Sequence, residues 1–135
     1  MTIQLSAAVR NARLDAIETV VSTAPLLRVY TGSMPADTAT AASGTLLAEA
    51  TLPSDWMAAA SGGSKAKSGT WEDTSANNNG NAGYFRIYDS TGTTCHLQGT
   101  VTATGGGGDM EVNNITFASG QAFTVTTFTL TDGNA

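Results

Sequence analysis

The last strand-like segment of the chain changes the phase of its apolar residues part-way along. Phe123 and Val125 share one parity, whereas Phe128 and Leu130 share the other. Because successive side chains of a strand point to opposite faces, this change requires either an extra residue or two buried faces. We predict a β-bulge at residues 126–127, which would leave both later residues in the protein's own core.

The preceding segment repeats this change of phase. Met110 and Val112 lie on one parity, and Ile115 and Phe117 lie on the other. Two neighbouring strands of this kind are typical of a sandwich whose strands bend at a corner and pass between sheets. Together with about seven or eight short strand-like segments separated by turns, they predict a mainly β fold. We expect a single antiparallel β-sandwich, jelly-roll-like, over residues 26–132.

Residues 6–22 predict one N-terminal amphipathic helix, with Ser6 as its N-cap. Arg10 and Arg13 lie inside the apolar arc, where their stems can cover apolar surface while their heads reach water or a carboxylate. The arc packs on the protein's own sheet or, alternatively, on a neighbouring subunit. Five apolar residues at helical spacing form it: Val9, Leu14, Ile17, Val20 and Val21.

Composition restricts the classes of function. The chain has 135 residues, and 1–135 is expected to form a single domain. Its net charge is −5 and its six basic residues are scattered, which argues against nucleic acid as a partner. Charged residues make up 13% of the chain, against roughly 25% in average globular proteins. Strand pairing, small-residue packing and association should therefore stabilise the fold more than ion pairs do.

Other features bear on location. No apolar run approaches the roughly 18 residues of a membrane span, so no membrane partner is expected. With one cysteine, Cys95, no disulfide can form within the chain, and synthesis in a reducing cytoplasm is expected. Lys65 and Lys67 lie in a Gly/Ser-rich loop, 61–69, where they are predicted to be solvated. Residues 54–60 suggest a short helical turn.

We find no pattern that indicates catalysis, a cofactor or a metal. His96 and Cys95 are neighbours on a predicted strand and should point to opposite faces, which disfavours a dyad. The glycines at 105–108 lack the Lys-Ser/Thr of a phosphate-binding loop and suggest a flexible hairpin connection. Asp109 and Glu111 supply two carboxylates, too few for the oxygen shell of Ca²⁺. The sequence therefore predicts a protein that is not an enzyme.

Four aromatic residues have two interpretations. They could pack in the core with polar tips at the rim, or they could form a carbohydrate or subunit contact surface. They are Trp56, Trp71, Tyr84 and Tyr88.

Several stretches together resemble a family of small virion proteins encoded beside the head and tail genes of tailed bacteriophages and prophages. The resemblance covers most of the chain. The stretches that carry it are 5–18, 52–57, 69–71, 85–89 and 127–132.

The resemblance implies a structural protein without catalytic residues. We expect a capsid cement or decoration protein on the exterior of the virion, bound to the major capsid protein and to itself as a dimer or trimer. The alternatives are a tail or head–tail connector component, or a carbohydrate-binding module of a tail tip. The candidate subunit or capsid contacts are Arg10, Arg13, Trp56, Trp71, Tyr84 and Tyr88.

Overall fold

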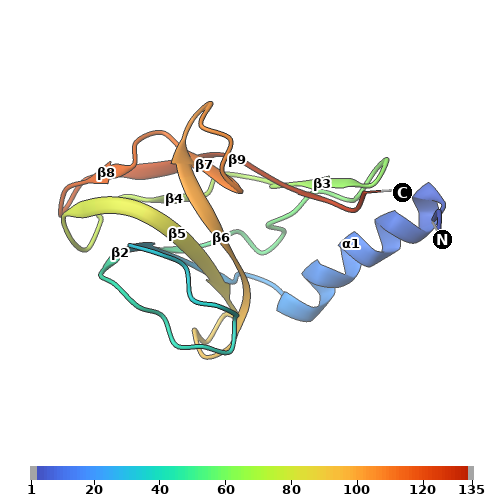
Figure 1. Ribbon diagram of the computed structural model, residues 1–135, viewed down its shortest axis with the longest axis horizontal. Coiled ribbons are helices and arrows are strands. Elements are labelled where there is room, and N and C mark those ends of the chain that lie inside the picture. Colours follow the sequence, from blue (N-terminus) through green and yellow to red (C-terminus); the bar gives the residue numbers. More distant parts are fainter. Residues whose placement is uncertain (1–2, 134–135) are drawn as a thin grey trace.

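The computed structural model describes residues 3–133 and is mainly β, with one helix beside a curled sheet (Figure 1). Neighbouring strands pair in the order β2-β1-β5-β6-β7-β9-β3, while β4 pairs with β9 and β8 with β5. The elements are α1 (Ala7–Val21), β1 (Leu26–Thr31), β2 (Leu46–Thr51), β3 (Ser64–Ala66), β4 (Glu72–Asp73), β5 (Gly80–Tyr88), β6 (Cys95–Ala103), β7 (Met110–Val112), β8 (Thr116–Phe117) and β9 (Phe123–Thr131).

The sheet is mixed, which corrects the expectation of antiparallel pairing throughout. β6 and β7 run parallel, with Val101 beside Met110, whereas the other strand pairs are antiparallel. The glycines at 105–108 therefore do not connect a hairpin. Their loop brings the chain back alongside β6, so that β7 can run in the same direction as β6. Asp109 holds the loop there by accepting hydrogen bonds from the N–H and hydroxyl of Thr100. The jelly-roll sandwich is not confirmed by this strand order.

The predicted bulge in the last strand is confirmed. Glu111 pairs with Thr127 and Val112 pairs with Val125, so that Thr126 is the extra residue on β9. Because the bulge restores the phase, Phe128 is buried with the same core as Val125. Leu130 is partly buried and packs against that core, also as predicted.

The upstream change of phase has a different origin. β7 ends at Val112, and the chain then joins another part of the sheet, where Phe117 of β8 pairs with Gly80 of β5. Ile115 is partly buried beside the core and Phe117 is buried within it. The two halves of this segment, β7 and β8, therefore both direct apolar residues into the core, but they pair with different strands.

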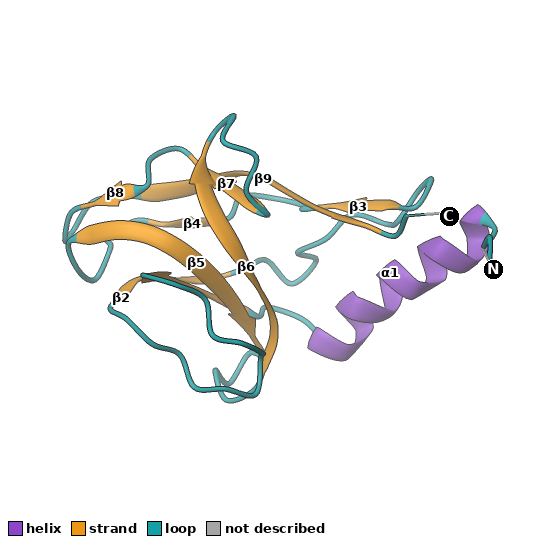
Figure 2. Ribbon diagram, viewed as in Figure 1, coloured by secondary structure: helices purple, strands orange, loops and turns teal. Residues whose placement is uncertain are grey.

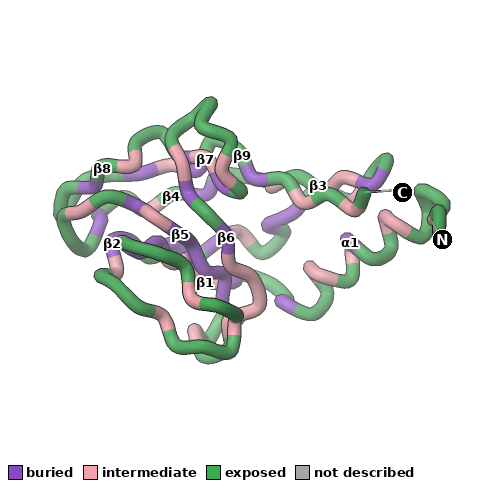
Figure 3. Tube along the Cα trace, in the orientation of Figure 1, coloured by how far each residue is buried: buried purple, intermediate pink, exposed green. Residues whose placement is uncertain are grey.

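α1 forms nearly as predicted, because the Ser6 hydroxyl accepts a hydrogen bond from the N–H of Val9. The expected docking of its apolar arc on the protein's own body holds for only part of the arc. Leu14 and Val21 are buried and Ile17 packs against the core, whereas Val9 is 46% exposed and Val20 is 68% exposed. α1 projects from the body beside β3, and its surface is mostly exposed (Figures 1 and 3).

The segment before β3 is extended, which corrects the predicted helical turn at 54–60. Met57 pairs with Lys67 in a β-bridge, and the carbonyl of Trp56 accepts a hydrogen bond from Ser68 N–H. Both Trp56 and Met57 are buried and belong to the core cluster. The segment lies opposite the C-terminal half of α1, and its Ala60 N–H donates to Asp15 Oδ1 at 3.0 Å.

Candidate interaction surface

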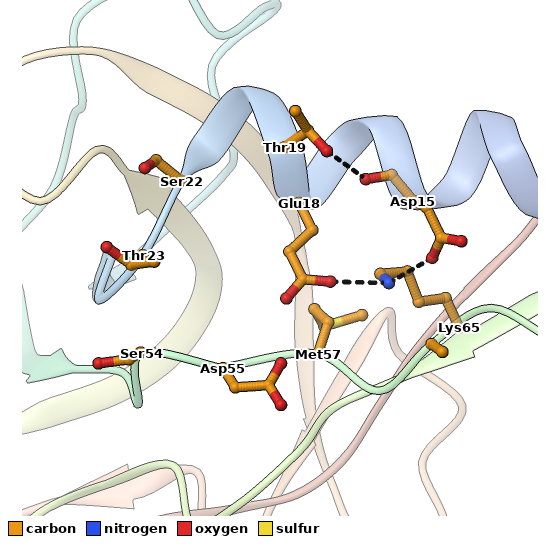
Figure 4. A pocket seen from close by; sticks show the side chains of 10 residues that line it. Asp15, Glu18, Thr19, Ser22, Thr23, Ser54, Asp55, Met57 and Lys65 are labelled. Atoms are coloured by element: carbon orange, nitrogen blue, oxygen red, sulfur yellow. Dashed lines mark hydrogen bonds and ion pairs between the residues drawn. The ribbon is translucent and has the colours of Figure 1, made fainter.

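A buried lysine joins α1 to the body. Pairing of β3 with β9 directs Lys65 toward the helix, where its side chain is 1% exposed. Its Nζ donates to Asp15 Oδ1 at 2.7 Å and to the Ala58 carbonyl at 2.8 Å, and it lies 2.8 Å from Glu18 Oε2 (Figure 4). The prediction that Lys65 is solvated is therefore wrong. Its charge is neutralised by two carboxylates from one face of α1.

These contacts shift the pKa values of the groups involved. Burial by itself would lower the pKa of Lys65, but the hydrogen bonds to Asp15 and Glu18 outweigh it and the net direction is upward. The Lys65 ammonium, followed by the Ala60 N–H, lowers the pKa of Asp15. Both partners are therefore held in their charged forms across the neutral range.

Arg10 and Arg13 join the other half of α1 to the C-terminal end of β9. Arg10 Nη1 donates to the Asp132 carbonyl at 3.1 Å, and Arg13 Nε lies 3.2 Å from the Asp132 carboxylate. The prediction that their heads reach water or a carboxylate is confirmed for Arg13, which contacts a carboxylate and remains 61% exposed, whereas the Arg10 head bonds a backbone carbonyl instead. Asn11 completes the attachment by accepting the N–H of Gly63 at 2.9 Å.

The charged side chains of α1 therefore point mainly toward its own protein. Arg10, Asp15 and Glu18 contact the body, although the Asp15 side chain is also 47% exposed, and Arg13 is 61% exposed. The opposite side of α1, which we name the outer face, carries mainly small and apolar residues. An exposed helix face normally carries mostly charged or polar residues, whereas five of the seven residues on this face are apolar. The outer face consists of Ala8, Val9, Ala12, Arg13, Ala16, Thr19 and Val20.

A cleft of about 540 Å³ opens between α1 and the segment 54–59. Glu18 and Asp55 lie on opposite sides of it, and the Lys65 amino group lies between the carboxylates of Asp15 and Glu18 (Figure 4). Two of the three acidic groups in the cleft are thus already paired. Its lining contains neither histidine nor cysteine among the residues that the structure describes.

The tryptophans pack in the core and leave no exposed ring surface for a sugar or subunit. Trp56 and Trp71 are fully buried, with ring centroids 5.9 Å apart. Their indole N–H groups donate to the carbonyls of Ser22 at 3.0 Å and Ser68 at 3.1 Å. The core interpretation therefore replaces the contact interpretation for both residues.

Tyr84 and Tyr88 of β5 are also buried. Tyr84 contacts the loop 32–45, which joins β1 to β2 (Figure 2). The Tyr84 hydroxyl bonds both the N–H and the carbonyl of Ser43, and the Tyr88 hydroxyl accepts from Arg86 at 3.2 Å. Burial, followed by a hydrogen bond with Tyr88, raises the pKa of Tyr30 to about 12. Tyr84 therefore holds the loop directly and Tyr88 bonds the arginine that holds it, and both rings lie inside the protein.

Arg86 is a structural residue that sequence reasoning missed. Its side chain is 1% exposed, and Nη2 donates to the carbonyls of Asp37, Thr38 and Thr40. The sequence pattern that could have predicted its burial is its position between two tyrosines on one face of a strand, since this implies that both faces of β5 are covered. The guanidinium thus fastens the loop to the sheet.

Cys95 and His96 lie apart from these clusters. Cys95 is half-buried, its Sγ lies 3.3 Å from the Leu97 carbonyl, and burial raises the pKa of its thiol. His96 lines a shallow hollow beside Val20 of α1. Within residues 3–133, no cluster of three or more His, Cys, Asp or Glu is placed to hold a metal ion. No helix in the same range has the length and apolar character needed to cross a membrane.

No family model matches this sequence, and neither a curated protein nor a solved structure matches it significantly. What the molecule does is therefore inferred from its own residues and their arrangement. Of the six candidate contact residues, the structure brings Arg10 and Arg13 together on Asp132 and places the four aromatic residues inside the protein.

Proposed function

We propose that this protein is a structural component of a tailed-bacteriophage virion, most specifically a cement protein on the capsid exterior. The supporting observation is the outer face of α1, whose Ala8, Ala12 and Ala16 are exposed at a spacing of four residues. Small apolar residues on a projecting helix suit close packing against another protein better than they suit water. The sequence resemblance to small virion proteins supports the same role.

The proposed mechanism is passive. The protein would bind the major capsid protein and itself, as a dimer or trimer, and the assembled shell would gain stability because ligands that bind only the assembled state favour it. This role requires no catalytic group. We also propose that the fold is a jelly-roll-like sandwich. In support, the sheet curls so that β2 lies near β4, and the N–H of Glu49 in β2 donates to the carboxylate of Asp73 in β4.

Copy number in purified virions tests the proposal. A cement protein should be present on the order of hundreds of copies, because it occupies repeated capsid positions. About six or twelve copies would instead indicate a tail or connector component at a single vertex. Quantitative mass spectrometry against the major capsid protein separates these outcomes.

Binding of purified protein to heads that lack it tests the surface. The double substitution Ala12→Glu and Ala16→Glu should reduce binding at least about tenfold, because it places two carboxylates on the outer face. Ala36→Glu, at an exposed position in the loop between β1 and β2, is the matched control and should bind as the wild type does. Equal binding by all three proteins would remove the outer face from the proposal.

A further inference from the structure

The link between α1 and β1 holds two non-glycine residues at positive φ. Ser22 has φ 72° and ψ −163°, a region that is populated almost only by glycine, and Ala24 has φ 49°. No other non-glycine residue between 3 and 133 has positive φ. Strain is therefore concentrated in the four-residue hinge formed by residues 22–25.

Specific contacts hold the hinge in this conformation. The Ser22 N–H donates to the Glu18 carbonyl at 2.8 Å, and its carbonyl accepts from Trp56 Nε1 at 3.0 Å. Ser22 is exposed, so packing of its own side chain does not compensate for the strain. An extended hinge would release the strain, and it would also carry α1 away from its position on the body.

The part of the body that binds α1, which we name the seat, is complementary to the helix in charge. The seat offers the ammonium of Lys65, the carboxylate and carbonyl of Asp132, and the N–H groups of Ala60 and Gly63. The helix offers two acids to the lysine and two arginines to Asp132. All of these contacts run between α1 and the body, so α1 of a second copy could form every one of them.

We infer that two copies of this chain exchange α1, each helix occupying the seat of the other copy across a two-fold dimer. A short strained hinge favours such an exchange, because the closed monomer carries the strain and the opened dimer does not. Four extended residues span at most about 14 Å, so the two bodies must lie close together. The exchange does not depend on the virion role, and its test uses the purified chain alone.

Zero-length cross-linking of an isotope mixture tests the exchange directly. Unlabelled and ¹⁵N-labelled chains are mixed in equal amounts, unfolded, refolded and treated with a carbodiimide, which joins Lys65 to Glu18 or Asp15. Exchange predicts that about half of these cross-linked peptides carry mixed labels. Cross-linked peptides whose two halves always carry the same label would show that each helix stays on its own body, and would overturn the proposal.

Hinge variants supply the second test, with light scattering after size-exclusion chromatography as the readout. Ser22→Gly should weaken the dimer at least about tenfold, because glycine removes the strain from the closed monomer. Thr23→Gly is the matched control: it adds the same residue type where φ is not positive, and it should change the dissociation constant far less. Equal effects of the two variants would refute the role of strain. A wild-type monomer at all concentrations, or a dimer that dissociates on Ala16→Glu and ignores Ser22→Gly, would refute the exchange.

Discussion

Replacing Lys65 with methionine measures how strongly the ionic contacts hold α1. Methionine retains much of the apolar stem and removes the ammonium group shared by Asp15, Glu18 and the Ala58 carbonyl. Hydrogen bonds to charged groups contribute about 1.5–3 kcal/mol each. Both carboxylates are partly exposed, so water can replace part of what they lose. We expect the free energy of unfolding to fall by about 2 kcal/mol at neutral pH.

Calorimetry or circular dichroism converts this expectation into a melting temperature. At about 2.1 cal/mol/K per residue, the unfolding entropy of 135 residues is roughly 0.28 kcal/mol/K, which gives a decrease of about 7 °C. Lys67→Met is the matched control, because the Lys67 ammonium donates to the Gly69 carbonyl and reaches neither carboxylate of α1. It should melt within about 2 °C of the wild type. An equally small change for Lys65→Met would refute the reasoning.

The effect of Lys65→Met should also depend on pH at both extremes. The pKa of Asp15 lies below its ordinary 3.8, so its stabilising contribution is present above pH 3.8 and is lost as the pH falls through the lowered pKa. The pKa of Lys65 lies above 10.5, so its contribution is complete below pH 10.5 and is lost as the pH rises through the raised pKa. Chemical denaturation should give a constant difference between wild type and variant from about pH 5 to 9. A difference that changes within that window would implicate another group.

Three further predictions concern the sheet. Arg86→Met should lower the free energy of unfolding by about 3 kcal/mol and make the loop 33–44 sensitive to limited proteolysis, because three carbonyls lose their donor; a resistant loop would contradict this. Deleting Thr126 should lower the free energy of unfolding by only about 1–2 kcal/mol, because it removes the bulged residue and keeps the apolar side chains on one face. Deleting Thr129 should instead disrupt the pairing of β9 with β3. Comparison of the two melting temperatures distinguishes these outcomes. The Cys95 thiol should react with a disulfide reagent at pH 8 more slowly in the folded protein than in denaturant, because burial raises its pKa; equal rates would show that the thiol is not protected.

The change of phase in the last strand could be predicted because its cause is local. A strand alternates with period two, so one extra residue between Val125 and Phe128 is visible in the sequence without knowledge of any partner strand. The position of the bulge at Thr126 follows from the same count. The helix cap at Ser6 was predictable for a similar reason, since the cap and its bonded N–H are three residues apart.

The contacts that depend on distant parts of the chain could not be predicted in this way. Lys65 lies among glycine and serine, which indicates a solvated loop, and its partner Asp15 is 50 residues away in sequence. Arg86 is fixed by carbonyls from a loop more than 45 residues upstream. The parallel pairing of Val101 with Met110 depends on how a flexible glycine loop is fastened by Asp109. In each case the local pattern was uninformative about the partner, and for Lys65 and the glycine loop it was also wrong about the backbone, since Lys65 lies in β3 and the loop joins parallel strands.

Most charged side chains of α1 contact the body, and this also affects how easily the helix can leave it. Detachment exposes two buried apolar side chains, Leu14 and Val21, which at about 1.5–3 kcal/mol each amounts to roughly 3–6 kcal/mol. Leu14 does not belong to the main core cluster, whereas Val21 does, so the sheet loses one core residue from α1 and keeps the others when the helix moves. The ionic groups of the seat would be hydrated after separation, which offsets part of what they lose. α1 should therefore open at a lower free energy than the sheet, and hydrogen exchange should show its amides less protected than those of β5. Equal protection would mean that helix and sheet open as one unit, and exchange of α1 between copies would then require global unfolding.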